Sequence, residues 1–251
     1  MHNLLAGKRI VITGAARGLG FEFAKAIAQQ GAHVILCDIL SDRLQQSITQ
    51  LRQAGLTADG FNLDIADPEA IAHVFQQIGQ QGNIDGLVNN AALATGVGGK
   101  TLDEYDLNLW DRVMTVNVRG TWLVTKAALP FLRQSRNAKI VNIASDTALW
   151  GAPKLMAYVA SKGAIISMTR SMARELGTHR ICVNAIAPGL TKVEATEYVP
   201  VERHQLYENG RAIQGEQKPE DVTGTVLYLL SPMADFVTGQ LIPVNGGFVF
   251  N

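Results

Sequence analysis

Three side chains that can move a proton lie close together in the middle of the sequence. Tyr158 and Lys162 are four residues apart in the run YVASK, and Ser145 lies thirteen residues before Tyr158. Residues i and i+4 share one face of a helix, so the Lys162 ammonium is expected near the Tyr158 phenol. A phenol with a pKa near ~10 is a poor base at neutral pH, and a nearby cation lowers that pKa towards the working range. The set therefore predicts a proton-transfer site.

A glycine-rich turn near the amino terminus could place a dinucleotide beside this set. Gly14, Gly18 and Gly20 directly follow the strand-like run VIT and open a helical pattern. Glycine permits unusual φ angles there and lets backbone N–H groups approach a pyrophosphate at the positive end of the helix. The spacing is GxxxGxG rather than GxGxxG, so a plain tight turn is the alternative for the turn taken alone. Together the two motifs predict both halves of a hydride-transfer enzyme.

The residue that ends the second predicted strand bears on which dinucleotide would bind. Asp38 lies about twenty residues after the glycines, where a carboxylate can accept hydrogen bonds from the ribose 2′-hydroxyl and repel a 2′-phosphate. Arg17 is an opposing signal, because a cation in the glycine turn could meet a 2′-phosphate. We expect the carboxylate to dominate, so the sequence favours NAD over NADP. Asp64 follows the third strand and could contact the adenine amino group, or it is an ordinary capping residue.

Short β-branched runs alternate with longer helical patterns along the whole chain. The strand-like runs are nearly continuous in apolar residues, which is typical of parallel strands covered on both faces. They fall at 8–13, 33–38, 57–63 (the weakest), 86–90, 139–144, 181–187 and 241–245, and the helical patterns at 19–30, 41–54, 68–80, 103–133 (broken), 157–177 and 219–230. Asp67 and Pro68 are typical of a helix start, as N-cap and first helical residue. The alternation predicts right-handed βαβ units in a doubly wound α/β fold with seven parallel strands.

Length and composition place these patterns in one globular domain, residues 1–251. The length suits one sizeable core, and 47% hydrophobic with 18% charged residues argue against disorder. Lysine plus arginine equals aspartate plus glutamate, at 22 each, so nothing points to nucleic acid or to an anionic membrane. Cys37 and Cys182 are expected to be buried free thiols, since both lie inside apolar runs and neither belongs to a CxxC motif. The run MHNLLAGKRIVITG lacks a signal-peptide pattern and no run approaches ~20 apolar residues, so a soluble cytoplasmic protein is expected.

One stretch, 190–217, has no clear periodic pattern. A long irregular segment in a compact α/β domain is usually functional or mobile. We therefore predict that 190–217 forms a lid over the substrate.

The chain resembles the classical short-chain dehydrogenases/reductases over essentially its whole length. The motifs that carry the resemblance agree in order and spacing: TGAARGLG (13–20), Asp64, NNAA (89–92), Asn117 in TVN, Ser145 in IVNIAS, YVASK (158–162), Asn184 with Pro188 and Gly189, and GQLIPVNGG (239–247). The resemblance implies a Rossmann-type fold, hydride transfer between NAD and a secondary alcohol or its ketone, and a homotetramer. It implies that the subunits pack through helices near 103–133 and 157–177 and through the carboxyl-terminal strand.

Carried over position by position, the resemblance also implies roles for single residues. Tyr158 would be the catalytic acid/base, and Ser145 would polarise the substrate oxygen. Lys162 would lower the tyrosine pKa and hold the nicotinamide ribose. Asn117 would open the 103–133 helix locally and support a water chain from Lys162. The implied cofactor contacts are Gly14, Arg17, Gly18, Leu19, Gly20, Asp38, Asp64, Ile65, Asn90, Ala92, Tyr158, Lys162, Pro188 and Thr191; no metal site is implied.

Three positions depart from the family pattern. Ala92 stands where the family often has glycine. Val193 replaces a threonine that often binds the nicotinamide amide, so Thr191 and backbone groups would carry that contact. Gly215 stands where an arginine is frequent, so a usual brace is expected to be missing. The residues expected to face a small or medium substrate are Ala94, Thr95, Asp146 to Trp150, Lys154 to Met156, and those from Leu190 onward.

Two other functions stay open on the sequence. An NADPH-dependent 3-oxoacyl-thioester reductase acting on an acyl-carrier protein is opposed by Asp38 and by the neutral net charge. The basic residues Arg133, Arg136, Lys139 and Arg174 keep it possible. A regulator that senses NAD without turnover is opposed by the intact set of Asn117, Ser145, Tyr158 and Lys162, since a sensor has no use for a proton relay.

Overall fold

One parallel sheet forms the centre of the computed structural model, which describes residues 3–251. Met1 and His2, the start of the amino-terminal run, lie outside the described residues. The strands follow the order β3-β2-β1-β4-β5-β6-β7, and every neighbouring pair is parallel. They are β1 (Arg9–Thr13), β2 (His33–Asp38), β3 (Ala58–Asn62), β4 (Gly86–Asn89), β5 (Lys139–Ile143), β6 (Cys182–Pro188) and β7 (Leu241–Val244). The predicted doubly wound, single-domain α/β fold with seven parallel strands is confirmed.

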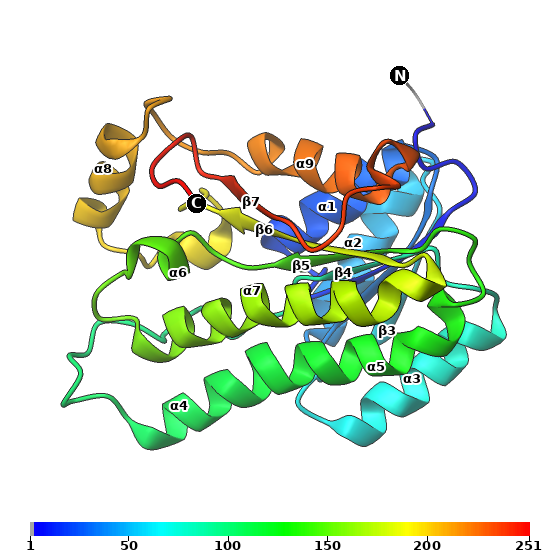
Figure 1. Cartoon of the computed structure of the whole chain (residues 1–251), viewed down its shortest axis with the longest axis horizontal. Coiled ribbons are helices and arrows are strands. Elements are labelled where there is room, and N and C mark those ends of the chain that lie inside the picture. The colour runs from blue at the N-terminus through cyan, green and yellow to red at the C-terminus, as the bar shows by residue number, and fades with distance from the viewer. Residues whose placement is uncertain (1–2) are drawn as a thin grey trace.

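Helices cover both faces of the sheet (Figure 1). One face is covered by α1 (Gly18–Gln29), α2 (Ser41–Gln53) and α9 (Glu220–Leu230), whose apolar residues share a core with one side of the strands. The other face is covered by α3 (Pro68–Gln80), α5 (Thr121–Leu132) and α7 (Met156–Leu176). Burial on both faces explains why the strands read as continuous apolar runs. Cys37 and Cys182 are buried free thiols, as expected.

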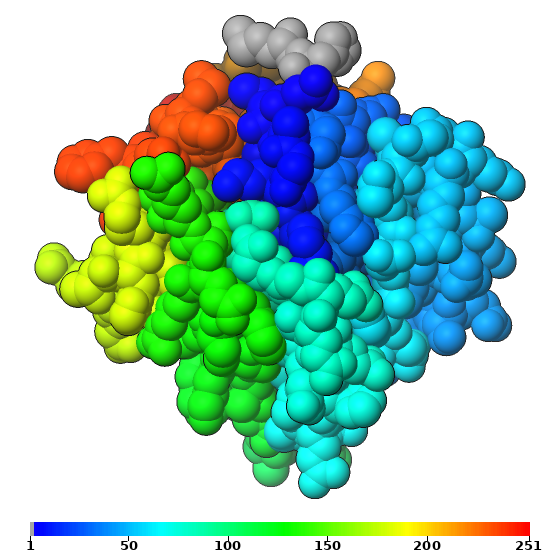
Figure 2. Space-filling model, turned by 90° about the vertical axis from the view of Figure 1, so that its right-hand side faces the viewer, coloured from blue at the N-terminus to red at the C-terminus, as the bar shows by residue number. Residues whose placement is uncertain are grey.

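β1, the first strand of the chain, lies near the middle of the sheet, and the later strands lie on both sides of it. Figure 2 shows the end of the molecule away from α8, where the amino-terminal part of the chain, in dark blue, has a central position. The order reverses between β1 and β4, and ligands of such sheets bind beyond the carboxyl ends of the strands at that point.

Local capping chemistry explains how α3 begins and how α1 differs from it. Asp67 is the N-cap of α3 and accepts hydrogen bonds from the backbone N–H groups of Glu69 and Ala70, with Pro68 as the first helical residue. The predicted helix start is confirmed. Arg17, the N-cap of α1, makes no side-chain capping bond. The first backbone N–H groups of α1 are therefore left for another acceptor.

The predicted break in the 103–133 helix is real. The chain forms α4 (Leu107–Met114), a π-helical segment (Thr115–Gly120) and α5. Asn117 lies inside the π-helical segment, where Thr121 Oγ1 donates to its backbone oxygen over 2.8 Å. Such π-turns are often found at functional sites.

The 190–217 segment is more regular than its sequence predicts. It contains a 3₁₀ turn (Glu194–Thr196) and the helix α8 (Val201–Gly210), and its two ends meet where Lys192 N donates to Gln217 O over 2.9 Å. Only Tyr207 of α8 is buried, so the helix lacks the apolar stripe that would reveal it in the sequence. A second short helix, α6 (Thr147–Trp150), was also not predicted.

None of the helices in the described part of the chain combines the length and apolar character of a transmembrane span.

Candidate active site

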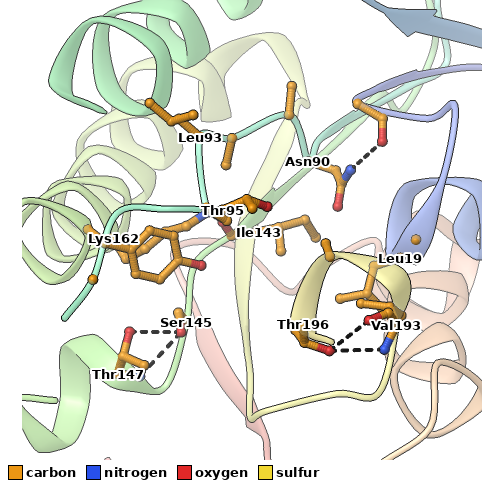
Figure 3. A pocket seen from close by; sticks show the side chains of 18 of the residues that line it. Leu19, Asn90, Leu93, Thr95, Ile143, Ser145, Thr147, Lys162, Val193 and Thr196 are labelled. Carbon is orange, nitrogen blue, oxygen red and sulfur yellow. Dashed lines mark hydrogen bonds between the residues drawn. The ribbon is translucent and has the colours of Figure 1, made fainter. Parts of the chain in front are cut away.

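A cavity of about 1150 Å³ opens at the carboxyl ends of the strands. Figure 3 shows Leu19 and Val193 on one side of it and Ser145 on another. The candidate residues on its wall are Gly14, Arg17, Gly18, Leu19, Gly20, Asp38, Asp64, Ile65, Asn90, Ala92, Ser145, Tyr158, Lys162, Pro188 and Thr191. Asn117 is the one candidate residue that does not line the cavity. The fold thus brings the two motif groups, more than a hundred residues apart, to one space.

The glycine turn forms a cradle that larger residues would fill. Gly14 has φ +64°, and a Cβ there would lie 2.7 Å from Ala91 Cα. A Cβ on Gly20 would collide with Gly14 O. The same turn ends in the uncapped start of α1, whose free N–H groups and positive dipole suit a pyrophosphate. The residues present therefore fit a dinucleotide.

Asn90 fixes the cradle to the sheet. Its Nδ2 donates to Thr13 O over 3.0 Å and to Gly14 O over 2.9 Å, and its backbone N donates to Thr13 Oγ1 over 3.1 Å. The asparagine read from the sequence as a cofactor contact thus holds the turn that would meet the cofactor. Its role is closer to positioning than to direct recognition.

The Asp38 carboxylate is buried and faces the cradle. Its Oδ2 accepts from Ala16 N over 2.9 Å, and its Oδ1 accepts from Leu40 N over 2.9 Å. Arg17 points elsewhere: its Nη1 lies 3.1 Å from Glu194 Oε1. This ion pair could not be predicted from the sequence, because Arg17 and Glu194 are 177 residues apart and only the tertiary fold brings them together.

The chemical side of the cavity is built from β5 and α7. Lys162 Nζ donates to Ile143 O over 2.7 Å and lies 5.5 Å from the centre of the Tyr158 ring. Ser145 Oγ accepts hydrogen bonds from the Thr147 hydroxyl over 2.9 Å and from Thr147 N over 3.3 Å (Figure 3). The sequence predicts Thr147 only as a residue that could face substrate. The two hydrogen bonds that it donates to Ser145 could not be predicted.

The pKa of Tyr158 is shifted upwards in the structure, whereas the sequence predicts that Lys162 lowers it. Burial raises the pKa of Tyr158, opposed by a hydrogen bond with Ser145 and assisted by the charges of Tyr198 and Asp146. Burial also lowers the pKa of Lys162 to about 8. The expected lowering of the tyrosine pKa by Lys162 is not seen here, because desolvation outweighs other effects and the amine is directed to a backbone carbonyl.

Asn117 does not line the cavity, but it bonds to segments next to the set of Ser145, Tyr158 and Lys162. Its Oδ1 accepts from Leu93 N over 2.7 Å, and its Nδ2 donates to Ser161 Oγ over 3.1 Å. Ser161 precedes Lys162 on α7, so the asparagine links the π-helical segment to the helix that carries the candidate base. The water chain implied by the resemblance stays a prediction.

The outer wall of the cavity comes largely from the 190–217 segment. Tyr198 OH donates to Ala94 O over 2.6 Å. Tyr207 OH donates to Asp146 Oδ1 over 2.8 Å and accepts from Trp150 Nε1 over 3.1 Å. Asp146 is fully buried, and burial raises its pKa to about 6 against the hydrogen bond from Tyr207. This buried contact ties α8 to the residue that follows Ser145.

Only part of the expected substrate-facing set reaches the cavity. Its wall includes Ala94, Thr95, Asp146, Thr147, Lys154 and Leu155. Trp150 packs instead against Tyr207 and Phe248, and Met156 is exposed. Leu149 packs against a separate core cluster. Leu149, Trp150 and Met156 therefore do not face the cavity, although the sequence places them in the substrate-facing set.

The brace expected to be missing at Gly215 is supplied from a different position. Arg211 donates to Leu190 O over 2.7 Å, to Gly215 O over 2.8 Å and to Gln217 Oε1 over 3.2 Å. Gly215 itself has φ +111°, a conformation that an arginine would adopt only with strain. Arg211 thus bonds to the backbone oxygen of Gly215, four residues later in the chain.

The fold and the cavity define a dinucleotide-binding oxidoreductase of the Rossmann type, and comparisons with known proteins narrow the class. A family model described as Enoyl-(Acyl carrier protein) reductase matches residues 14–249. The 3-oxoacyl-(acyl-carrier-protein) reductase of Thermotoga maritima is 35% identical over 246 residues, covering 98% of this chain and 99% of that one. The 5-keto-D-gluconate 5-reductase of Escherichia coli K12 is 34% identical over 251 residues, covering 98% of this chain and 96% of that one.

A solved structure agrees with these relatives. The gluconate 5-dehydrogenase of Burkholderia cenocepacia, in complex with NADP and tartrate, has a TM-score of 0.92 and 27% identity, covering 98% of this chain and 97% of that one. The chain belongs to the short-chain dehydrogenase/reductase family. It is an NAD(P)-dependent oxidoreductase acting on CH–OH groups.

Proposed function

We propose that the protein is an NAD-dependent oxidoreductase that interconverts a secondary alcohol and its ketone, with Tyr158 as the acid/base. The observation that carries this is the placement of Tyr158, Ser145 and Lys162 on the wall of a cavity that also contains the glycine cradle and Asp38. Residues that can transfer a proton lie in the same cavity as a turn that can bind a pyrophosphate. This combination suits hydride transfer to or from a dinucleotide better than other reactions. The cofactor contacts in the cradle are part of the proposal.

The chain's own residues would handle the proton and the orientation of substrate. In the oxidative direction the Tyr158 phenolate accepts the hydroxyl proton, while Ser145 donates a hydrogen bond to the same oxygen. Lys162 is a cation below its pKa of about 8, and its charge, 5.5 Å from the centre of the Tyr158 ring, would oppose the burial that raises the pKa of the phenol. The lysine would also hold the nicotinamide ribose. Bound NAD would supply the acceptor for the hydride that leaves the carbinol carbon. In reduction Tyr158 returns its proton to the ketone oxygen.

We infer the preference for NAD from the buried Asp38 carboxylate at the end of β2. A 2′-phosphate near a buried carboxylate would be repelled, whereas a 2′-hydroxyl can donate to it. The B. cenocepacia structure contains NADP, which makes NADP the alternative. The substrate would be a small or medium secondary alcohol or ketone, held between the β5 side of the cavity and the 190–217 segment, which would act as a lid.

A second candidate is an NADPH-dependent 3-oxoacyl-thioester reductase, favoured by the T. maritima relative. Three of the four basic residues that keep a carrier protein possible do not support it. Lys139 is buried, with Nζ 2.8 Å from Asp235 Oδ1. Arg133 and Arg136 precede the amino end of β5, whereas the cavity lies at the carboxyl ends of the strands. A carrier docked on those arginines would be at the wrong end of the sheet.

The test is a fluorescence titration with NADH and NADPH, followed by a panel of ketones with the tighter one. The panel includes 5-ketogluconate, an acetoacetyl thioester and simple methyl ketones. Tighter NADH binding with turnover of a free ketone supports the proposal. Tighter NADPH binding with turnover confined to the thioester contradicts it and supports the second candidate.

We also infer a homotetramer, formed through the helices near 103–133 and 157–177 and the carboxyl-terminal strand. Large apolar side chains are exposed on or near these elements, including Leu107, Trp122 and Phe236. Light scattering should give about four times the 27.1 kDa chain mass. A monomer mass would contradict the assembly without touching the proposed chemistry. The cytoplasmic location stays a prediction.

A further inference from the structure

Glu194 joins three parts of the chain at the rim of the cavity. Its Oε1 lies 3.1 Å from Arg17 Nη1, and its Oε2 lies 3.3 Å from Arg43 Nη2. Arg17 belongs to the glycine turn and Arg43 to the first turn of α2, 177 and 151 positions away in the sequence. Each carboxylate oxygen therefore holds one guanidinium, and the 190–217 segment is tied to both elements.

The turn that carries Glu194 is fixed beside the cradle. Thr196 Oγ1 accepts from Val193 N over 3.1 Å (Figure 3) and donates to Thr191 O over 2.8 Å. A Cβ on Gly18 would lie 3.9 Å from Val193 Cβ, so the turn packs over the start of α1. A second hollow of about 370 Å³ shares Arg17 with the main cavity and is lined by Arg43 and Glu194.

The charges around this rim bear directly on nucleotide choice. Arg17 and Arg43 contribute two positive charges, and Asp38 and Glu194 contribute two negative charges, so the group of four is formally neutral. Without the Glu194 charge the group would be formally positive by one. A 2′-phosphate carries about −1.5 to −2 at neutral pH, so this difference changes its attraction to the rim. A 2′-hydroxyl has no charge and should respond little.

We propose that Glu194 is a specificity-determining residue: by pairing with Arg17 and Arg43 it withholds both guanidiniums from the 2′-phosphate of NADP(H). The inference rests on the proposed dinucleotide-dependent function and adds the residue that tunes the choice of nucleotide. The Arg17 and Glu194 side chains are 38% and 47% exposed. Exposed ion pairs are weak one by one, so the expected change in binding is about five- to tenfold.

The experiment measures dissociation constants for NADH and NADPH by nicotinamide fluorescence, with no substrate present. The variant is Glu194→Gln, which keeps the shape and removes the charge. The matched control is Glu197→Gln, an exposed glutamate on the same segment that forms no ion pair within residues 3–251. Both changes are repeated in an Arg17→Gln/Arg43→Gln background, and all titrations are run at about 0.05 M and about 0.5 M salt.

The expected result is that Glu194→Gln tightens NADPH binding about five- to tenfold and changes NADH binding less than about twofold. The gain should vanish in the double-arginine background and shrink at high salt, and Glu197→Gln should leave the ratio unchanged. An unchanged ratio, an equal loss for both nucleotides, or a gain that survives without the arginines overturns the proposal. The wild-type ratio separately tests the proposed NAD preference, so the two ideas can fail independently.

Discussion

The two walls of the cavity are held in place in different ways. The cofactor wall is made of strand ends and backbone: the glycine turn packs against Ala91, and Asn90 bonds to the carbonyls of Thr13 and Gly14. The outer wall, formed by the 190–217 segment, is held by hydrogen bonds of side chains, both to other parts of the chain and within the segment. Tyr207 binds Asp146, and Arg211 binds Leu190.

From this difference we expect the cofactor wall to be rigid and the outer wall, which would contact the substrate, to be adjustable. Backbone packed on a parallel sheet leaves little freedom, whereas a segment fixed by a few polar side chains can open by breaking them. The cofactor wall should therefore tolerate no added atom, and the outer wall should respond to the loss of single hydrogen bonds. The predictions below address the two walls separately.

Of the changes to these two walls, the larger effect is expected from Gly14→Ala in the cofactor wall. The new Cβ would lie 2.7 Å from Ala91 Cα, in a backbone with φ +64°, so the turn has to shift. We expect NADH binding to weaken at least about tenfold and the free energy of unfolding to fall by about 1–3 kcal/mol. Gly224→Ala on α9 is the control, since a Cβ there meets nothing within 4 Å. Gly14→Ala with wild-type NADH affinity would show that the wall is not rigid.

A smaller effect is expected from Tyr207→Phe in the outer wall. Removing the hydroxyl leaves the buried Asp146 Oδ1 without the hydrogen bond of 2.8 Å. Loss of a buried partner costs about 1–3 kcal/mol, so we expect the KM for ketone to rise about five- to tenfold. NADH affinity should stay within about twofold. Tyr228→Phe, on a residue packed against the α1 side of the core, is the control. A loss of NADH affinity equal to the rise in KM would mean that the two walls are not independent.

The cofactor wall and the outer wall also differ in how much of each could be predicted from the sequence. Gly14 and Asp38 could be placed at this cavity from the sequence because each lies where a predicted strand ends and a helix follows, which is a local pattern with a physical meaning; Asn90 is placed there by the family resemblance. Five strands, β1, β2, β4, β5 and β6, could be assigned because their burial on both faces leaves continuous apolar runs, whereas β3 is largely unburied and gives the weakest run. Glu194 and Arg211 could not be assigned, since their partners are distant in the sequence and charged residues on an irregular segment usually face solvent.

A third effect is expected in the pH dependence of stability. Burial raises the pKa of Asp146 from 3.8 to about 6, so the folded chain holds this proton more tightly than the unfolded chain does. Its contribution to stability is present below about pH 4 and is lost as the pH rises through about 6, at most about 3 kcal/mol. Asp146→Asn removes this titration. The Tm difference, variant minus wild type, should increase between about pH 4 and about pH 7, and a flat difference would contradict the buried-acid assignment.

The central claim is that Tyr158 moves the substrate proton in a cavity that binds NAD independently of that phenol. The most direct test is to measure NADH affinity and ketone turnover on the same preparation of Tyr158→Phe. We predict that turnover falls by at least about a hundredfold, the range of general acid–base catalysis, while NADH affinity stays within about threefold. Turnover within about tenfold of wild type, with NADH still bound, would contradict the assignment of Tyr158 as the acid/base.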